Sequence, residues 1–272
     1  MLAATRFRRW VLRRPPLSGP SGRGLAAVAG IAAMLVLTLA GAAAPRAVPA
    51  PRTRDAAPPR AAGRGATRRT SCTSVAHIGD STSADLISSA DLPDPAQQLP
   101  ARYADVGVRH LLIDASGGRS IVETLPGQVN GYNVALSWWN EGYRGCWVFA
   151  LGTNDAANVA AGSGVGMMAR IQEMMSVAHG EPVMWVNTIT QLGSGPYAEA
   201  NEQLWDNTLV RALAMYPNMR IFDWAAVAQP SWFLSDGIHY NSAGCAARAQ
   251  DIADALAQAF PVHGHSSSPI VR

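Results

Sequence analysis

The sequence contains no lysine, and acidic residues are almost absent from its first quarter. All 22 basic residues are arginines, a bias that we attribute to GC-rich codon usage rather than to chemistry. Residues 1–70 hold 13 arginines and one carboxylate, Asp55, so they carry +12 of a chain whose net charge is +3. Residues 71–272 therefore carry −9. Because the net positive charge is confined to the amino-terminal extension, the sequence indicates no nucleic-acid partner.

Cysteine is also scarce, with Cys72, Cys146 and Cys245 only. An odd number excludes a framework in which every cysteine is paired within the chain. Cys72 lies nine residues before Ser81, and Cys146 lies eight residues before Asn154. If both cysteines precede parallel strands of one sheet, they meet at the same edge of it. We therefore expect a Cys72–Cys146 disulfide, with Cys245 as a small buried residue in a helix.

The histidines lack the spacing of a metal site. His77, His110 and His179 fit structural positions better than ligand positions, and His263 and His265 lie in a tail without apolar pattern. The sequence therefore predicts neither a metal nor a cofactor.

One long apolar run is present, over residues 25–44, and it contains no charged residue. Its 20 residues are just enough for a membrane-spanning helix across roughly 30 Å of hydrocarbon. The arginine-rich leader 1–24 predicts a cytoplasmic amino terminus and export of the rest. The small residues that end the run also fit a cleaved signal peptide. We favour an anchor, so the chain is expected on the cell membrane, or secreted if the signal is cleaved.

Composition divides the remainder into three parts. Residues 45–71 form a Pro/Ala/Arg tract that is expected to be a disordered linker. Residues 72–262 are long enough for one substantial core and form the predicted extracytoplasmic domain. Residues 263–272 are expected to be a disordered tail.

Apolar runs and helical spacing alternate along the predicted domain. Buried strands are expected at 75–78, 110–113, 146–151, 182–186 and 219–223, and helices at 166–178, 198–215 and 242–260. Continuous apolar strands separated by helices predict a parallel sheet covered on both faces. We expect an α/β fold of three α/β/α layers around a five-stranded parallel sheet, with its site at the carboxyl ends of the strands.

Polar residues follow these strands in a suggestive order. Ser81 comes after the first strand, Gly118 after the second and Asn154 after the third, while Asp236 and His239 precede the last helix. Each segment alone also fits an ordinary turn or helix cap. Together they supply a nucleophile, a backbone N–H, a side-chain amide and an acid–base pair, which are the parts of a serine acyl-transfer site.

These four segments resemble the conserved blocks of the SGNH (GDSL-type) hydrolases. The resemblance covers roughly residues 73–260 and implies that Ser81 is the nucleophile, His239 the general base and Asp236 its orienting acid. It further implies an oxyanion hole made by the Ser81 N–H, a glycine N–H and the Asn154 amide. Either Gly117 or Gly118 suits that position.

A narrower set of residues resembles the extracytoplasmic SGNH domain of peptidoglycan O-acetyltransferases. These residues are Ile113–Arg119, Val186–Thr188, Asp223–Trp224 and Asp236–His239. This likeness favours Gly118 for the oxyanion hole. Those proteins often carry a multi-span acyltransferase domain, whereas this chain has one apolar run. A transferase reaction would then need a separate membrane donor protein or a soluble ester.

Three further residues are candidates for substrate binding: Arg119, Asn187 and Tyr197. Tyr197 belongs to a glycine-containing loop, residues 190–198, that is expected to overhang the catalytic edge. The main hypothesis is an exported serine esterase or O-acyltransferase that acts on acyl esters, in particular acetyl esters, of envelope glycans. The alternatives are a lipid esterase or thioesterase, and a tethered carbohydrate-binding module with an idle site.

Overall fold

The computed structural model describes residues 68–266 and 268–272. The predicted leader 1–24, the apolar run 25–44 and residues 45–67 of the predicted linker lie outside the described residues. Within the described part, no helix is both long and apolar enough to cross a membrane.

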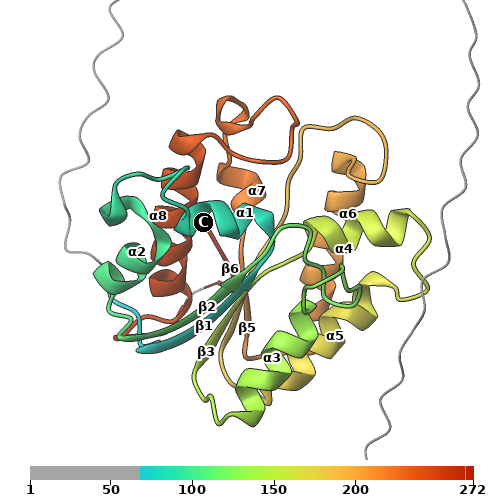
Figure 1. Ribbon diagram of the computed structural model, residues 1–272. Helices are drawn as coiled ribbons and strands as arrows, with labels where there is room; N and C mark the ends of the chain where they lie inside the picture. The colour runs from blue at the N-terminus through green and yellow to red at the C-terminus, as the bar shows by residue number, and fades with distance from the viewer. Residues whose placement is uncertain (1–67, 267) are drawn as a thin grey trace, which may run out of the picture. The chain divides into compact units, whose positions relative to one another are not determined.

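A parallel sheet of six strands forms the centre of the fold (Figure 1). The strand order is β2-β1-β3-β4-β5-β6, and every neighbouring pair is parallel. The strands are β1 Ser74–Gly79, β2 His110–Ala115, β3 Cys146–Ala150, β4 Val183–Val186, β5 Met219–Phe222 and β6 Ile270–Val271. Since all strands run in one direction, their carboxyl ends lie along a single edge, which we call the catalytic edge.

Helices cover both faces of the sheet, which gives the three layers that the sequence predicts. Helices α2 and α8 pack together on one face, and α3, α4, α5 and α6 lie on the other (Figure 1). Their bounds are α2 Leu99–Val106, α3 Gly131–Asn140, α4 Thr153–Ala160, α5 Met167–Ala178, α6 Glu199–Ala212 and α8 Ser242–Ala259. Two short helices, α1 Ser81–Ala84 and α7 Trp224–Val227, follow β1 and β5 at the catalytic edge.

Alternate residues of the central strands enter opposite cores. On β3, Val148 packs in the core formed with α2 and α8, whereas Trp147 and Phe149 pack in the core formed with α3, α5 and α6. All three side chains are fully buried. Burial on both faces explains why this strand reads as a continuous apolar run in the sequence.

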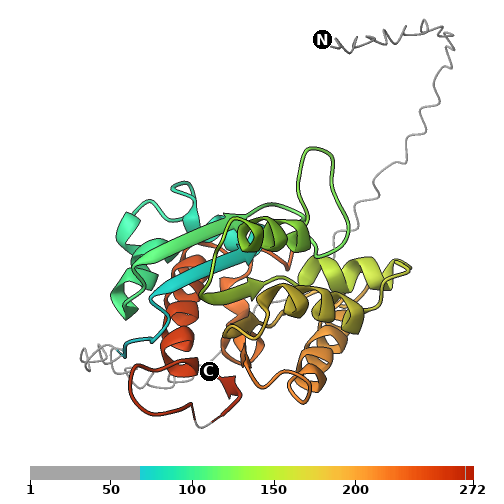
Figure 2. The ribbon, with the colours of Figure 1, turned by 90° about the horizontal axis from the view of Figure 1, so that it is seen from below.

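The sixth strand corrects two expectations, because it raises the strand count from five and lies in the tail 263–272 that we expected to be disordered. The Ile221 N–H donates to the Pro269 carbonyl at 2.9 Å, and the Asp223 N–H donates to the Val271 carbonyl at 2.9 Å. Figure 2 shows the carboxyl-terminal segment passing the end of α8 to reach this edge of the sheet. A strand of two residues is too short to produce a periodic signal in the sequence. Its carbonyls nevertheless accept hydrogen bonds from backbone N–H groups that β5 would otherwise leave unpaired at the edge of the sheet.

The boundary of the domain also differs from the predicted residue 72. The Thr70 N–H donates to the Val106 carbonyl at 2.9 Å, and the Ser71 N–H donates to the Phe260 carbonyl at 2.8 Å. Residues 68–71 therefore belong to the folded domain rather than to the linker.

Cys72 and Cys146 form the expected disulfide, with their Cα atoms 5.6 Å apart. Cys146 begins β3 and pairs in register with Val75 of β1, three residues after Cys72. The bond therefore joins the beginnings of two neighbouring strands. Cys245 is a free, buried thiol in α8, as expected.

Candidate active site

Ser81 lies in the turn that follows β1 and is the first residue of α1. The Asp80 carboxylate caps this helix, because its Oδ1 accepts bonds from the Thr82 N–H at 2.9 Å and the Thr82 hydroxyl at 2.7 Å. A side chain at Gly79 would bring its Cβ to 2.3 Å from the Cβ of Ser83. The helix therefore packs directly on a bare backbone, and this close turn holds Ser81 at the catalytic edge.

His239 and Asp236 reach the same point from the loop that precedes α8. The Nε2 atom of His239 is 2.9 Å from the Ser81 hydroxyl, and its Nδ1 atom is 2.8 Å from Oδ2 of Asp236. An ionised carboxylate only accepts, so this geometry assigns the proton to Nδ1 and leaves Nε2 to accept from the serine. The structure thus brings together the three residues that the sequence singled out.

The loop itself fixes the Asp236 carboxylate. Its Oδ1 accepts bonds from the backbone N–H groups of Ile238 at 2.9 Å and His239 at 3.0 Å. Partial burial opposes ionisation, but these two N–H groups and the His239 imidazole together lower the pKa of Asp236 below its ordinary value. Asp236 is therefore ionised at neutral pH, as an orienting acid requires.

Asn154 lies in the first turn of α4, directly after β3. Its Nδ2 atom donates to the Arg119 carbonyl at 3.0 Å, while its Oδ1 atom accepts from the Tyr197 hydroxyl at 3.0 Å. These two bonds fix the orientation of the amide. Because Nδ2 carries two hydrogens, one N–H is left to donate to a ligand.

The glycine pair after β2 forms a tight turn. The Arg119 N–H donates to the Ser116 carbonyl at 3.2 Å, and Gly118 has φ +70°, a conformation that favours glycine. A Cβ at Gly118 would also lie 2.7 Å from Leu125, whereas one at Gly117 would meet open space. Over the described residues, neither glycine N–H donates to a protein acceptor, so both are available to a ligand.

A buried ionic network, which the sequence did not reveal, holds this glycine turn against α4. Oδ1 of Asp155 accepts from the Ile121 N–H at 2.9 Å and from Arg170 at 2.8 Å, and Arg170 also pairs with Glu123. The side chains of Asp155 and Arg170 are fully buried. Burial raises the pKa of Asp155, while the Ile121 N–H and the Arg170 guanidinium oppose that rise. Asp155 directly follows Asn154, which the sequence singled out, but no sequence pattern indicates that Glu123 pairs with Arg170.

Arg248 of α8 is a second buried residue that the sequence did not reveal. Its guanidinium lies 3.4 Å from the hydroxyl of Thr82 and 5.5 Å from the ring centre of Tyr240. Thr82 follows Ser81 and Tyr240 follows His239, so one side chain contacts the neighbours of both reacting residues. No carboxylate of the described residues pairs with it.

The structure does not support Arg119 and Asn187 as substrate-binding residues. The Arg119 side chain is 4% exposed and pairs with Asp114 at 2.8 Å. The Asn187 amide donates to Asp223 at 2.9 Å and accepts from the Ala225 N–H at 2.9 Å. Arg119 thus connects the ends of β1 and β2, and Asn187 connects the ends of β4 and β5. The sequence alone does not show whether a polar side chain points into the protein or toward a ligand.

Tyr197, in contrast, lies at the site through its bond to Asn154. The loop 190–198 lies along the catalytic edge, since the Gln191 N–H donates to the carbonyl of Gly237 at 2.8 Å. A role in binding or gating substrate remains a prediction for this loop.

His77 lies near Ser81 but is a structural residue. Its ring is fully buried between the Tyr103 hydroxyl at 2.9 Å and the Ser83 hydroxyl at 3.1 Å. Burial lowers the pKa of His77 to about 3, and the Arg248 charge adds to this effect, so the ring is neutral. In residues 68–266 and 268–272, no group of three or more histidine, cysteine or acidic side chains is arranged to hold a metal ion.

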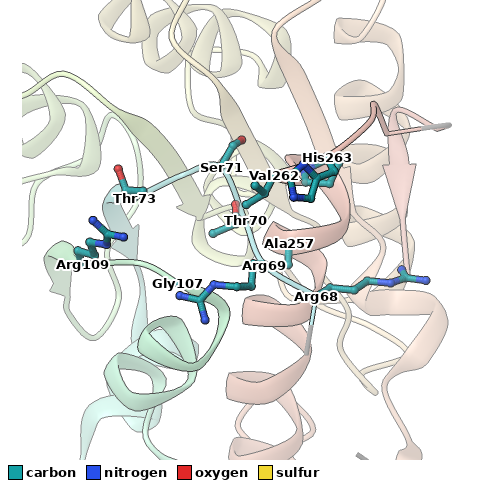
Figure 3. A pocket seen from close by; sticks show the side chains of 11 residues that line it. Arg68, Arg69, Thr70, Ser71, Thr73, Gly107, Arg109, Ala257, Val262 and His263 are labelled. Atoms are coloured by element: carbon teal, nitrogen blue, oxygen red, sulfur yellow. The ribbon is translucent and has the colours of Figure 1, made fainter. Parts of the chain in front are cut away.

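The candidate site lies on an open surface. The side chains of His239 and Asp236 are 34% and 47% exposed. Both side chains are thus partly accessible to a ligand. A cavity of about 720 Å³ lies near the amino ends of β1 and β2, and Figure 3 shows its lining.

Several solved structures resemble this chain over about two thirds of its length. A carbohydrate acetylesterase family member from Sinorhizobium meliloti has 16% identity and a TM-score of 0.52, over 66% of this chain and 95% of its own. A lipase/acylhydrolase from Enterococcus faecalis has 14% identity and a TM-score of 0.51, over 70% and 100%. The catalytic domain of Streptococcus pneumoniae peptidoglycan O-acetyltransferase A has 16% identity and a TM-score of 0.47, over 67% and 89%.

Neither a scan against protein-family models nor a search of curated proteins finds a match to this chain. The structural likeness shows the fold alone, an α/β/α arrangement that this chain shares with the carbohydrate acetylesterase family member and the lipase/acylhydrolase. The chemistry of the site therefore has to be argued from its own residues.

A pair of buried carboxyls supports the catalytic edge from α6. Asp206 accepts from the N–H of Thr188 at 3.0 Å and from its hydroxyl at 3.1 Å. Glu202 is fully buried, and neither of its oxygens makes a well-formed hydrogen bond among the described residues. Burial raises the pKa of Glu202 to about 9 and that of Asp206 to about 7.

We predict that Glu202→Gln stabilises the protein at alkaline pH. The folded state keeps a proton on Glu202 that the unfolded chain releases above pH 4.5, so stability is lost between pH 4.5 and about 9. The variant lacks this loss. It should match the parent at pH 4 and exceed its free energy of unfolding by about 2–4 kcal/mol at pH 8, since one pKa unit corresponds to about 1.4 kcal/mol. Denaturant unfolding at both pH values measures the difference.

Glu173→Gln, at an exposed position of α5, is the matched control and should show no such pH-dependent gain. A gain for Glu202→Gln that is equal at pH 4 and pH 8 would contradict the assignment of a buried neutral carboxyl.

Proposed function

We propose that this protein is a serine esterase or O-acyltransferase that works through an acyl-Ser81 intermediate. The observation that carries the proposal is the continuous hydrogen-bonded chain from Asp236 through His239 to Ser81. The two contacts measure 2.8 Å and 2.9 Å, which is the reach that proton transfer to a general base needs.

In the first step, His239 removes the hydroxyl proton of Ser81 while the serine oxygen attacks the ester carbonyl. The ionised Asp236 stabilises the imidazolium that forms. The free N–H of Asn154 and a backbone N–H of the turn at Gly118 donate to the oxyanion, together with the Ser81 N–H. His239 then returns the proton to the departing alcohol, and the acyl group remains on Ser81.

In the second step, His239 activates the acceptor that attacks the acyl-enzyme. Water as acceptor gives a free acid, and a sugar hydroxyl gives a transferred ester. Both outcomes use the same groups, so the geometry of the reacting residues serves either reaction.

The substrate that we propose is an acyl ester, in particular an acetyl ester, of an envelope glycan. The open surface around His239 and Asp236 supports a polymeric substrate, because a glycan chain can lie across it. The fold accommodates such chemistry, since a carbohydrate acetylesterase shares it. The narrower sequence likeness adds less support for this substrate, because its polar side chains bind each other rather than facing a ligand. Arg119 pairs with Asp114, and the Asn187 amide donates to Asp223.

We also propose that the domain acts outside the cytoplasm, either tethered through residues 25–44 or secreted. The Cys72–Cys146 disulfide supports this location, since such bonds persist in oxidising compartments. If the reaction is a transfer, a separate membrane protein or a soluble ester would supply the acyl group.

A lipid esterase or thioesterase is the second candidate, and two exposed leucines favour it. Leu125 is 44% exposed and lies beside Gly118, and Leu234 is 47% exposed with its N–H bonded to the His239 carbonyl. These side chains flank the site and offer apolar contact to an acyl chain. Esters of increasing acyl length separate the candidates, because only a lipid-type enzyme should prefer the long chains.

We predict that the full chain hydrolyses 4-nitrophenyl acetate and that Ser81→Ala lowers kcat/KM by about 10⁴-fold or more. Asn154→Ala should lower kcat by about 10²- to 10³-fold with little change in KM, because its N–H acts on the transition state. Steady-state kinetics measure both effects. Ser89→Ala, at an exposed serine, is the matched control and should keep full activity. Turnover by Ser81→Ala equal to that of the parent would refute the proposal.

We predict that a sugar acceptor diverts the acyl-enzyme. With chito-oligosaccharide present, mass spectrometry should detect acetylated sugar that is absent from the Ser81→Ala reaction. Free acetate as the only product, at an unchanged rate of nitrophenol release, would identify an esterase and exclude transfer to this acceptor.

A further inference from the structure

The cavity of about 720 Å³ lies at the edge of the sheet opposite to Ser81. Its walls come from the segment before β1, the turn before β2 and the chain that follows α8, as Figure 3 shows. A neighbouring cavity of about 310 Å³ shares four of its lining residues: Arg68, Ala257, Pro261 and His263. We call the two together the basic pocket.

Basic residues line the basic pocket, and acidic residues do not. Arg68, Arg69, Arg109 and His263 line the larger cavity, and no aspartate or glutamate lines either cavity. Among the described residues, no carboxylate forms an ion pair with any of the three arginines. Asp55 is the only acidic residue of the sequence before Arg68 and Arg69. Uncompensated arginines stand out in a domain whose residues 71–272 carry −9.

Backbone hydrogen bonds fix the positions from which these side chains extend. The Arg69 carbonyl accepts from the Val262 N–H at 3.1 Å, and the Arg109 N–H donates to the Thr73 carbonyl at 2.8 Å. The Arg69 guanidinium lies against Gly107, where an added Cβ would meet it at 3.1 Å. In Figure 3 the Arg69 side chain extends toward Arg109, and the Arg68 side chain extends to the other side.

Arg69 and Arg109 are exposed and line one cavity, so an anion bound there would be attracted by both positive charges. Guanidinium groups bind phosphate oxygens with paired, charge-assisted hydrogen bonds, which makes arginine well suited to phosphate recognition. The hydroxyl of Thr73 lines the same cavity and can add a donor.

We propose that the basic pocket binds the phosphate group of a phosphate ester, held chiefly by Arg69 and Arg109. The source is either a phospholipid headgroup or a soluble phosphate ester. A headgroup in this position would turn the catalytic edge away from the bilayer, since the pocket and Ser81 lie at opposite ends of the strands. The proposal is independent of the ester chemistry at Ser81.

The test is titration of the full chain, in a nonionic detergent, with inorganic phosphate by isothermal calorimetry. We expect one saturable site whose Kd rises at least about tenfold in Arg69→Gln/Arg109→Gln, because two charge-assisted contacts are lost. Glutamine keeps most of the apolar stem, and near-ultraviolet circular dichroism verifies the fold. Arg144→Gln/Arg211→Gln removes the same charge from exposed positions elsewhere and should bind as the parent does.

Absence of saturable binding by the parent overturns the proposal, and so does equal weakening in both double variants. A second arm identifies the source by adding phosphatidylglycerol or phosphatidylcholine to the micelles. If phosphatidylglycerol alone abolishes the phosphate titration, the pocket binds a lipid headgroup. If neither lipid changes it, the ligand is a soluble phosphate ester.

Discussion

The common direction of the strands is the constraint on which the site depends. Ser81, Gly118 and Asn154 follow β1, β2 and β3, which are neighbours in the sheet, so parallel strands deliver all three to one edge. His239 arrives from a loop 158 residues beyond Ser81, and its Nε2 atom still lies 2.9 Å from the serine hydroxyl. An antiparallel neighbour would place its loop at the opposite edge, where the basic pocket lies.

Two buried arginines give this edge its rigidity. Arg170 connects α5 to Asp155, whose other bond holds the segment after Gly118. Arg248 connects α8 to the residue next to Ser81 and to the residue next to His239. Removing one partner of the Arg170–Asp155 pair would leave a buried charge without compensation, at a cost of about 3–5 kcal/mol. The two arginines thus connect the helices to the segments that carry the candidate site.

The sequence predicted the parts that depend on local pattern. Five strands and the helices α5, α6 and α8 follow from apolar spacing. Ser81 follows from its place after a strand, and Asp236 and His239 follow from their place before the last helix. Pairing in space was harder to foresee. The strand at 270–271 is too short for a pattern, and Glu123 and Arg170 lie 47 residues apart. Arg119 was misassigned because the sequence does not show which way a side chain points.

The central claim is that Ser81 is a nucleophile activated by His239. Phenylmethanesulfonyl fluoride reacts with activated serines, and peptide mass spectrometry identifies the residue that carries the adduct. In the full chain, we predict a single sulfonyl group on the peptide that contains Ser81, and a strong loss of labelling in His239→Ala. Labelling of other serines at the same rate, or equal labelling of Ser81 in His239→Ala, would contradict the account.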